Sequence, residues 1–97
     1  MAEVLSEEAI RAAVADLPGW QREGNEIRKR FQFKDFRHAM EFVNRVADEA
    51  ESAQHHPDID IRYNTVTMAL STHSAGGLTR KDMHLAGRID AAQTPTL

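Results

Sequence analysis

Residues 58–71 read DIDIRYNTVTMALS, and this stretch decides the fold class. Apolar and polar residues alternate on either side of Asn64, which is the period of two expected of a half-buried β-strand. The two runs are predicted to be strands joined tightly around Asn64, and strands joined so closely pair in the antiparallel direction. Their apolar faces comprise Ile59, Ile61 and Tyr63 in the first run and Val66, Met68 and Leu70 in the second.

The chain before this hairpin predicts another one. Residues 26–34 alternate, with Ile27, Phe31 and Phe33 on one face and basic or amide side chains on the other. The turn Glu23-Gly24-Asn25 joins this strand to a short strand that begins at Trp20.

Helices are predicted at three places around the hairpins. Ser6 is the expected N-cap of a first helix that Pro18-Gly19 ends, and Asp35 is the expected N-cap of a second helix. Thr79 and Asp82 have the spacing of a capping box, so both receive a structural role at the start of the third helix. Apolar residues at helical spacing are Ile10, Ala13, Val14 and Leu17 in the first helix and Phe36, Ala39, Met40, Val43, Val46, Ala47 and Ala50 in the second.

The predicted order is therefore α-β-β-α-β-β-α. Hairpin connections imply the α+β class, with a four-stranded antiparallel sheet covered on one face by helices. A length of 97 residues with 41% hydrophobic residues fits one globular domain over residues 1–97.

Composition excludes several kinds of function. The chain has no cysteine, so disulfides and thiolate metal sites are impossible, and its net charge of −3 disfavours direct nucleic-acid binding. No signal-peptide pattern occurs at the N-terminus, and no apolar run approaches the ~18 residues of a membrane span. A cytoplasmic protein without membrane contact is expected.

Histidines mark the candidate site. His55 and His56 stand where the second helix gives way to a strand, and Pro57 favours an extended conformation for His56. His73 follows Ser71 by two residues, so both project from one side at the end of the next strand. In a tight hairpin the start of one strand lies beside the end of the other, so three histidines are predicted to cluster at one end of the sheet and to share one cavity.

Histidines at such positions also have other roles. A single histidine at a strand end is ordinarily structural or solvated, and His38 and His84 on helices are predicted to be solvated. Zinc held by imidazoles with Glu51 or Asp58 is an alternative. Because no HExxH or similar ligand pair at helical spacing occurs, no metal is expected.

The pattern resembles the signature of the pterin-4a-carbinolamine dehydratases, and the similarity runs from about residue 5 to residue 89. The resemblance implies a homodimer or homotetramer, no metal or organic cofactor, and dehydration of the substrate 4a-hydroxytetrahydropterin to quinonoid dihydropterin. That reaction recycles tetrahydrobiopterin for aromatic amino acid hydroxylases such as phenylalanine hydroxylase. The residues that carry the resemblance are Glu51, His55, His56, Pro57, Tyr63, His73 and Asp82, with flanking runs FQFKDF at 31–36, STH at 71–73 and AGGLT at 75–79.

The resemblance also implies which residues meet the substrate. Dehydration needs an acid for the departing hydroxyl and a base for the N5 proton, and histidine serves both purposes near neutral pH. We expect His55 and His73 to exchange these protons and His56 to position the substrate and assist. Glu51 is expected to orient an imidazole or to accept a pterin N–H. The implied pterin-binding residues are Gln54, His55 and His56 at the corner and Ser71, Thr72, His73 and Ser74 at the strand end.

Two residues depart from the family pattern, and two other functions are alternatives. Ser74 and Arg80 stand where relatives often carry acids, but neither is a signature position. One alternative is a non-catalytic dimerisation cofactor, because some animal members bind a homeodomain transcription factor through a helical surface. Another is a related pterin step in molybdopterin or folate metabolism.

Overall fold

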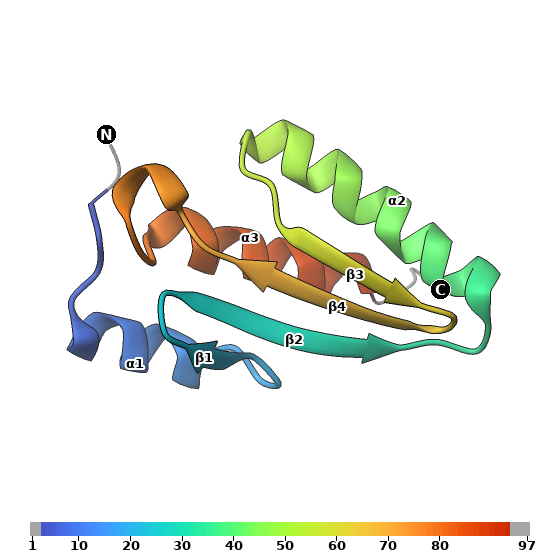
Figure 1. The fold of residues 1–97 in the computed structure, drawn as a ribbon, viewed down its shortest axis with the longest axis horizontal. Coiled ribbons are helices and arrows are strands. Elements are labelled where there is room, and N and C mark those ends of the chain that lie inside the picture. Colours follow the sequence, from blue (N-terminus) through green and yellow to red (C-terminus); the bar gives the residue numbers. More distant parts are fainter. Residues whose placement is uncertain (1–2, 94–97) are drawn as a thin grey trace.

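The computed structural model of the protein describes residues 3–93. Two hairpins and three α-helices alternate along the chain, as Figure 1 shows. In chain order the elements are α1 (Glu7–Ala15), β1 (Gln21–Glu23), β2 (Glu26–Gln32), α2 (Phe36–Ala53), β3 (Asp58–Arg62), β4 (Thr65–Leu70), the 3₁₀ turn η1 (His73–Ala75) and α3 (Arg80–Gln93).

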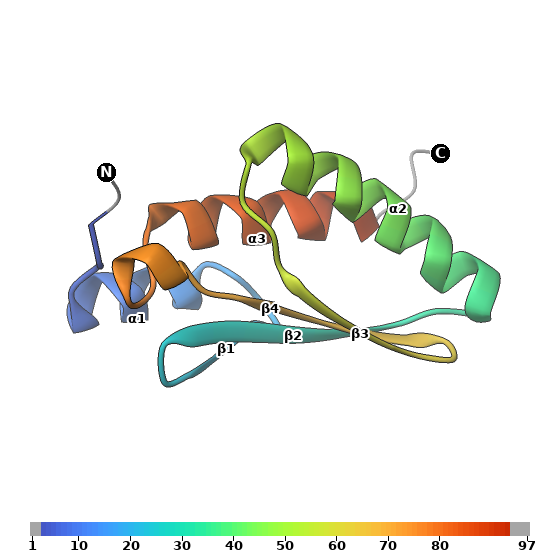
Figure 2. The ribbon, with the colours of Figure 1, turned by 45° about the horizontal axis from the view of Figure 1, so that its top comes forward.

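The four strands form one antiparallel sheet in the order β1-β2-β4-β3, so β1 and β3 are its edges. The helices cover one face of the sheet and leave the other open (Figure 2). Tyr63 adopts a left-handed conformation (φ 51°) in the tight turn between β3 and β4. The predicted fold class and element order are confirmed, and η1 is an addition that the sequence did not reveal.

The core lies between the sheet and the helices. Its members come from alternate positions of β2 and β4 and from the inward faces of α2 and α3, as the periods of two and 3.6 require. Fully buried core residues include Ile27, Phe31, Val66, Met68, Leu70, Phe42, Val46, Leu85 and Ile89.

A lysine shares the core-facing side of β2. Lys29 lies between Ile27 and Phe31 in the strand alternation, and its Nζ is 2.9 Å from Asp90 Oδ1 and 4.9 Å from the centre of the Phe31 ring. The Trp20 indole N–H also donates to Asp90, at 3.1 Å. These contacts tie α3 to β2 and to the segment before β1.

Side-chain caps start the helices as predicted. Ser6 accepts a hydrogen bond from the backbone N–H of Ala9 at 3.1 Å, and Asp35 accepts one from the backbone N–H of His38 at 2.9 Å. The His38 backbone N–H, followed by its ring, lowers the pKa of Asp35. However, α1 ends at Ala15, before the predicted stop, because a residue that precedes proline disfavours helical geometry.

The buried stripe of α2 differs from the prediction. Phe42, absent from the predicted stripe, is fully buried with Ala39, Val46 and Ala50, whereas Phe36 is 50% exposed. The apolar surface of α2 is wider than its fully buried row, so Phe36 stays outside the core while Val43 packs against the edge of it. No helix within residues 3–93 is both long enough and apolar enough to cross a membrane.

Candidate functional site

The corner between α2 and β3 carries the first two histidines. The helix ends at Ala53, and Gln54 takes a left-handed conformation (φ 52°) as its C-cap. The backbone N–H of His55 still bonds to the Ala50 carbonyl at 3.1 Å, while Pro57 leads into β3. The chain is therefore irregular here, and the two adjacent imidazoles find separate partners.

His55 contacts a buried carboxylate. Its Nε2 lies 2.6 Å from Oδ1 of Asp82, and the two side chains are 11% and 0% exposed. Asp82 also accepts from the Thr72 hydroxyl at 2.8 Å and from the Thr79 backbone N–H at 2.9 Å, both at Oδ2. Because an ionised carboxylate only accepts hydrogen bonds, Nε2 is the donor of the His55 pair.

This network joins distant parts of the chain. The Thr72 and Thr79 hydroxyls are 2.8 Å apart, and Thr72 forms an isolated β-bridge with Gly77 that folds the end of β4 back toward α3. Asp82 therefore contributes to the start of α3, as the capping box predicts, and in addition fixes His55. The local sequence pattern held no sign of that second contact.

The other imidazole of the corner stays at the surface. Nε2 of His56 is 2.6 Å from Oε2 of Glu51, one turn earlier on α2, and both side chains are well exposed. Glu51 thus contacts an imidazole, and that imidazole belongs to His56. Gln54 is exposed beside them.

His73 lies in η1, beyond the end of β4, and is exposed. Ser71 and His73 line a hollow of about 350 Å³ together with Glu23, Asn25, Glu26 and Gly76. Thr72 points the opposite way and is buried, whereas Ser74 is exposed.

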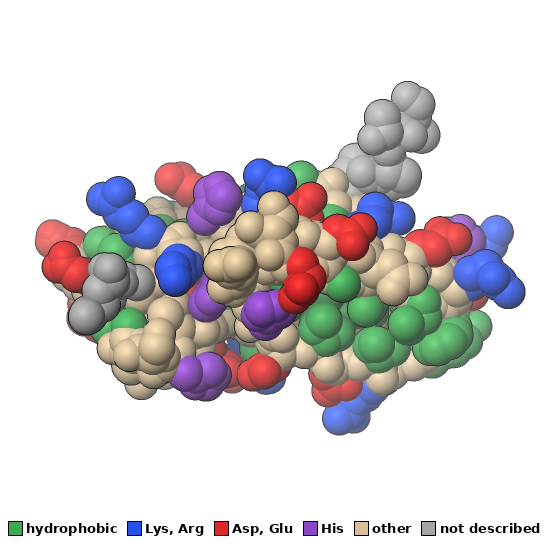
Figure 3. Space-filling view, turned by 90° about the horizontal axis from the view of Figure 1, so that it is seen from above, with side chains coloured by type: hydrophobic (Ala, Val, Ile, Leu, Met, Phe, Trp, Pro, Cys, Tyr) green, Lys and Arg blue, Asp and Glu red, His purple; other side chains and the backbone are tan. Residues whose placement is uncertain are grey.

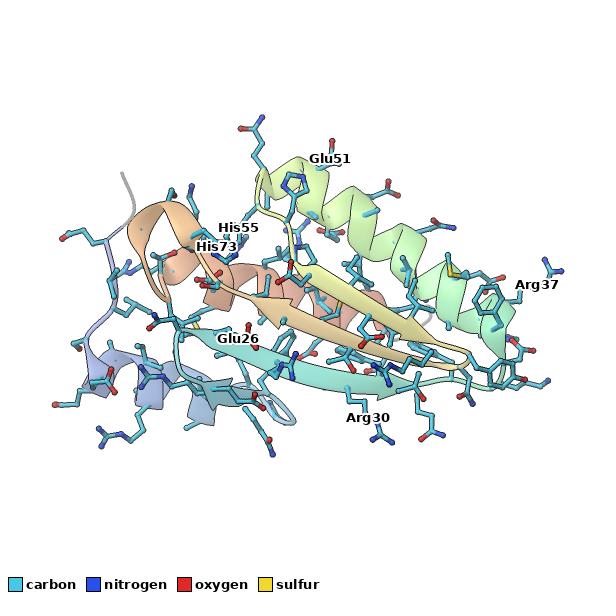
Figure 4. The ribbon with its side chains drawn as sticks, viewed as in Figure 1. Glu26, Arg30, Arg37, Glu51, His55 and His73 are labelled. Atoms are coloured by element: carbon cyan, nitrogen blue, oxygen red, sulfur yellow. The ribbon has the colours of Figure 1, made fainter. Side chains whose placement is uncertain are left out.

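The histidines thus gather at one end of the sheet, but the hollow beside His73 is not the predicted cavity shared by all three. Figure 4 shows His55 and His73 at the same end of the molecule, near the end of α2 that bears Glu51. The hollow that His73 lines is lined by neither His55 nor His56. Among residues 3–93, no group of three or more histidines and carboxylates is arranged to hold a metal ion.

Comparisons with known proteins agree on one family. The family model described as pterin 4 alpha carbinolamine dehydratase matches residues 3–92. A relative from Roseiflexus castenholzii, named provisionally as a pterin-4-alpha-carbinolamine dehydratase, is 57% identical over 90 residues, covering 93% of this chain and 97% of its own.

Solved structures are similar as well. The crystal structure of a transcriptional coactivator/pterin dehydratase from Brucella melitensis has a TM-score of 0.91 and 35% identity, and the match covers 95% of this chain and all of that one. A pterin dehydratase-like protein identified as a RuBisCO assembly factor in the alpha-carboxysome has a TM-score of 0.64 and 23% identity, covering 79% of this chain and 89% of its own. The second likeness concerns the fold alone.

Proposed function

Because this chain belongs to the pterin-4a-carbinolamine dehydratase family, we propose that it removes water from 4a-hydroxytetrahydropterin to give quinonoid dihydropterin. The observation that carries the proposal is the His55–Asp82 pair, a nearly buried imidazole held by a fully buried carboxylate. Such pairing is how proteins orient a histidine for proton transfer.

The reaction needs two proton transfers and little else. The C4a hydroxyl leaves as water after it receives a proton, and the N5–H gives up its proton as the C4a=N5 double bond forms. One group therefore acts as an acid and another as a base, after which the two have exchanged protonation states. Two imidazoles suit this exchange, and each acid or base typically contributes about 10²–10⁴-fold.

In this proposal His55 is the fixed member of the pair. Asp82 accepts the Nε2 proton, so Nδ1 is the ring nitrogen that exchanges a proton with the substrate. Asp82 is a positioning residue, since it selects the tautomer of His55 without touching the substrate.

His73 is the second proton-exchanging residue, and His56 assists. His73 stands at the rim of the hollow with Ser71, where an incoming substrate can reach it. Glu51 holds His56 at the surface, next in sequence to His55. Gln54, Thr72 and Ser74 complete the proposed binding residues, and the buried Thr72 would contribute through its backbone.

In this proposal no cofactor takes part, because the pterin is itself the substrate. The quinonoid product is then reduced by a separate enzyme. The protein would thereby recycle tetrahydrobiopterin in the cytoplasm for aromatic amino acid hydroxylases such as phenylalanine hydroxylase.

A homo-oligomer, either a homodimer or a homotetramer, is part of the same proposal. All five residues of the edge strand β3 are exposed, including Ile59 at 38% and Ile61 at 37%. Hydrophobic side chains gather on the face of the molecule that Figure 3 shows. The exposed large hydrophobic residues of α2, β3 and the turn after it are Phe36, Ile59, Ile61 and Tyr63.

A second copy fits this edge. If two β3 strands pair in the antiparallel direction about Ile61, Asp60 of each copy lies opposite Arg62 of the other, which brings opposite charges together. An unpaired edge with exposed isoleucines is otherwise prone to aggregation. Pairing of two copies would cover it.

A binding role is the second candidate function. The Brucella melitensis neighbour is named both as a transcriptional coactivator and as a pterin dehydratase. In such a role the partner would bind a helical surface, such as the exposed side of α2 where Phe36 lies. A binding role of this kind would not require the buried His55–Asp82 pair.

Stopped-flow measurement of 4a-hydroxytetrahydropterin breakdown, with and without the protein, tests the proposal. Acceleration that is proportional to protein concentration supports a dehydratase. Breakdown at the spontaneous rate, with a correctly folded protein, would leave the binding role as the better account.

A further inference from the structure

We propose that Glu26 binds the N–H edge of the pterin's pyrimidine ring, in the hollow that Ser71 and His73 line. This inference rests on the proposed function, and it names a residue that sets specificity for the ring rather than one that transfers protons.

The size and the polar lining of the hollow suit a flat polar ring. At about 350 Å³ it lies between the β1–β2 turn, the end of β4 and η1, and it is lined by Glu23, Asn25, Glu26, Ser71, His73 and Gly76. These residues supply carboxylate, amide, hydroxyl and imidazole groups within one space. Gly76, which is left-handed (φ 79°), adds no side chain to it.

The strand register selects Glu26 from the two carboxylates. Ile27 pairs with Leu70, so Glu26 lies one residue further along, opposite Ser71 at the end of β4. Glu23 pairs with Glu26 and is one strand more distant from β4. The Glu26 side chain is also less exposed, at 33% against 56% for Glu23. Glu26 is therefore the carboxylate nearer to His73.

Arg28 keeps the Glu26 carboxylate in place and leaves room for a ligand. Its Nε is 3.0 Å from Oε2 of Glu26. The contact is made at Oε2, which retains a second lone pair, and it leaves Oε1 to accept from a ligand. The carboxylate can therefore accept two parallel N–H groups while it still contacts Arg28.

A pterin offers such a pair of donors. Its ring N3–H and 2-amino group lie side by side, and a carboxylate accepts both as it does the parallel N–H groups of a guanidinium. In the pyrimidine ring, C4a stands directly opposite C2. A ring held at C2 by Glu26 therefore has C4a, where the hydroxyl leaves, on the side far from that carboxylate. His73 lines the same hollow from η1.

The test measures binding separately from turnover. The probes are 7,8-dihydropterin, which has the 2-amino group, and 7,8-dihydrolumazine, which has an oxygen in its place. Affinities for both are measured by titration calorimetry for the wild type, for Glu26→Gln and for Glu41→Gln. Glu41 is an exposed glutamate of α2 outside the hollow, so the control removes the same charge elsewhere.

We expect the wild type and Glu41→Gln to prefer dihydropterin over dihydrolumazine by about 10- to 100-fold, the usual effect of hydrogen bonds to a charged group. Glu26→Gln should lose most of this preference because its amide presents a donor to the ligand's donors. The Glu26→Gln variant should still bind dihydrolumazine, which would show that the hollow is intact.

Two results would overturn the inference. One is a Glu26→Gln variant that retains the full preference for dihydropterin. The other is equal loss of both ligands, or no binding of either by the wild type. Stopped-flow turnover is measured on the same samples. If wild type and Glu26→Gln both dehydrate the substrate at the same rate, the inference fails while the proposed function stands.

Discussion

Substitution of Asp82 by asparagine should impair catalysis more than stability. Asp82 accepts three hydrogen bonds while fully buried, one from His55 and two from Thr72 and Thr79. Asparagine has the same shape but only one accepting oxygen. If that oxygen keeps the contacts to Thr72 and Thr79, the amide NH2 faces His55 and forces its Nε2 to accept. The proton then moves to Nδ1, the atom assigned to exchange with the substrate.

The magnitudes follow from these contacts. One exchanged hydrogen bond to a charged group costs about 1–3 kcal/mol of folding free energy, which a domain stable by about 5–15 kcal/mol tolerates. A histidine held in the wrong tautomer should lose the usual contribution of an acid or base, about 10²-fold or more in kcat. Asp82→Ala should cost about 3–5 kcal/mol, because it breaks a buried pair outright.

Stopped-flow kinetics and urea denaturation of Asp82→Asn, with Asp35→Ala as control, measure both effects. Asp35 caps α2 as Asp82 caps α3, but it contacts no proposed site residue. The control should therefore lose stability and keep its rate. A folded Asp82→Asn variant with a wild-type rate across the pH range would refute the positioning role of Asp82.

Three further predictions concern the rest of the molecule. Ile61→Lys should reduce the oligomer to monomers in light scattering after gel filtration, because a lysine on β3 opposes edge pairing, and an unchanged mass would rule out this edge. Phe42→Ala should cost about 3–5 kcal/mol in urea denaturation, since Phe42 is fully buried; a loss below about 1 kcal/mol would mean that the core is misplaced. Asp35 has a lowered pKa, so its stabilisation should be full above the ordinary carboxyl pKa and disappear as pH falls through the lowered value. Thermal melting of wild type and Asp35→Ala from pH 2 to 7 should therefore show that their stabilities converge in acid. A difference that stays constant with pH would contradict the lowered pKa of Asp35.

Local patterns in the sequence predicted most of the fold. Alternation around Asn64 predicted β3 and β4, and the cap residues Ser6 and Asp35 predicted two helix starts. These signals succeed because each depends on neighbours within a few residues. Phe42 escaped the prediction because apolar residues cover more of α2 than the core uses, so periodicity alone did not select the buried row.

The site was less accessible to sequence reasoning. The spacing of Ser71 and His73 placed them on one side of their strand, and the structure puts both in one hollow. The contact between His55 and Asp82 spans 27 positions and depends on how α3 docks against the corner. Glu26 lines the same hollow because β2 pairs with β4, and no local sequence motif predicts that pairing.

The role of His55 and His73 in proton transfer is tested by comparing wild type with a His55→Ala/His73→Ala double variant in the stopped-flow breakdown of 4a-hydroxytetrahydropterin. We expect a clear acceleration by the wild type and a rate close to the spontaneous one for the double variant. A folded double variant as fast as the wild type would show that these imidazoles do not carry the protons.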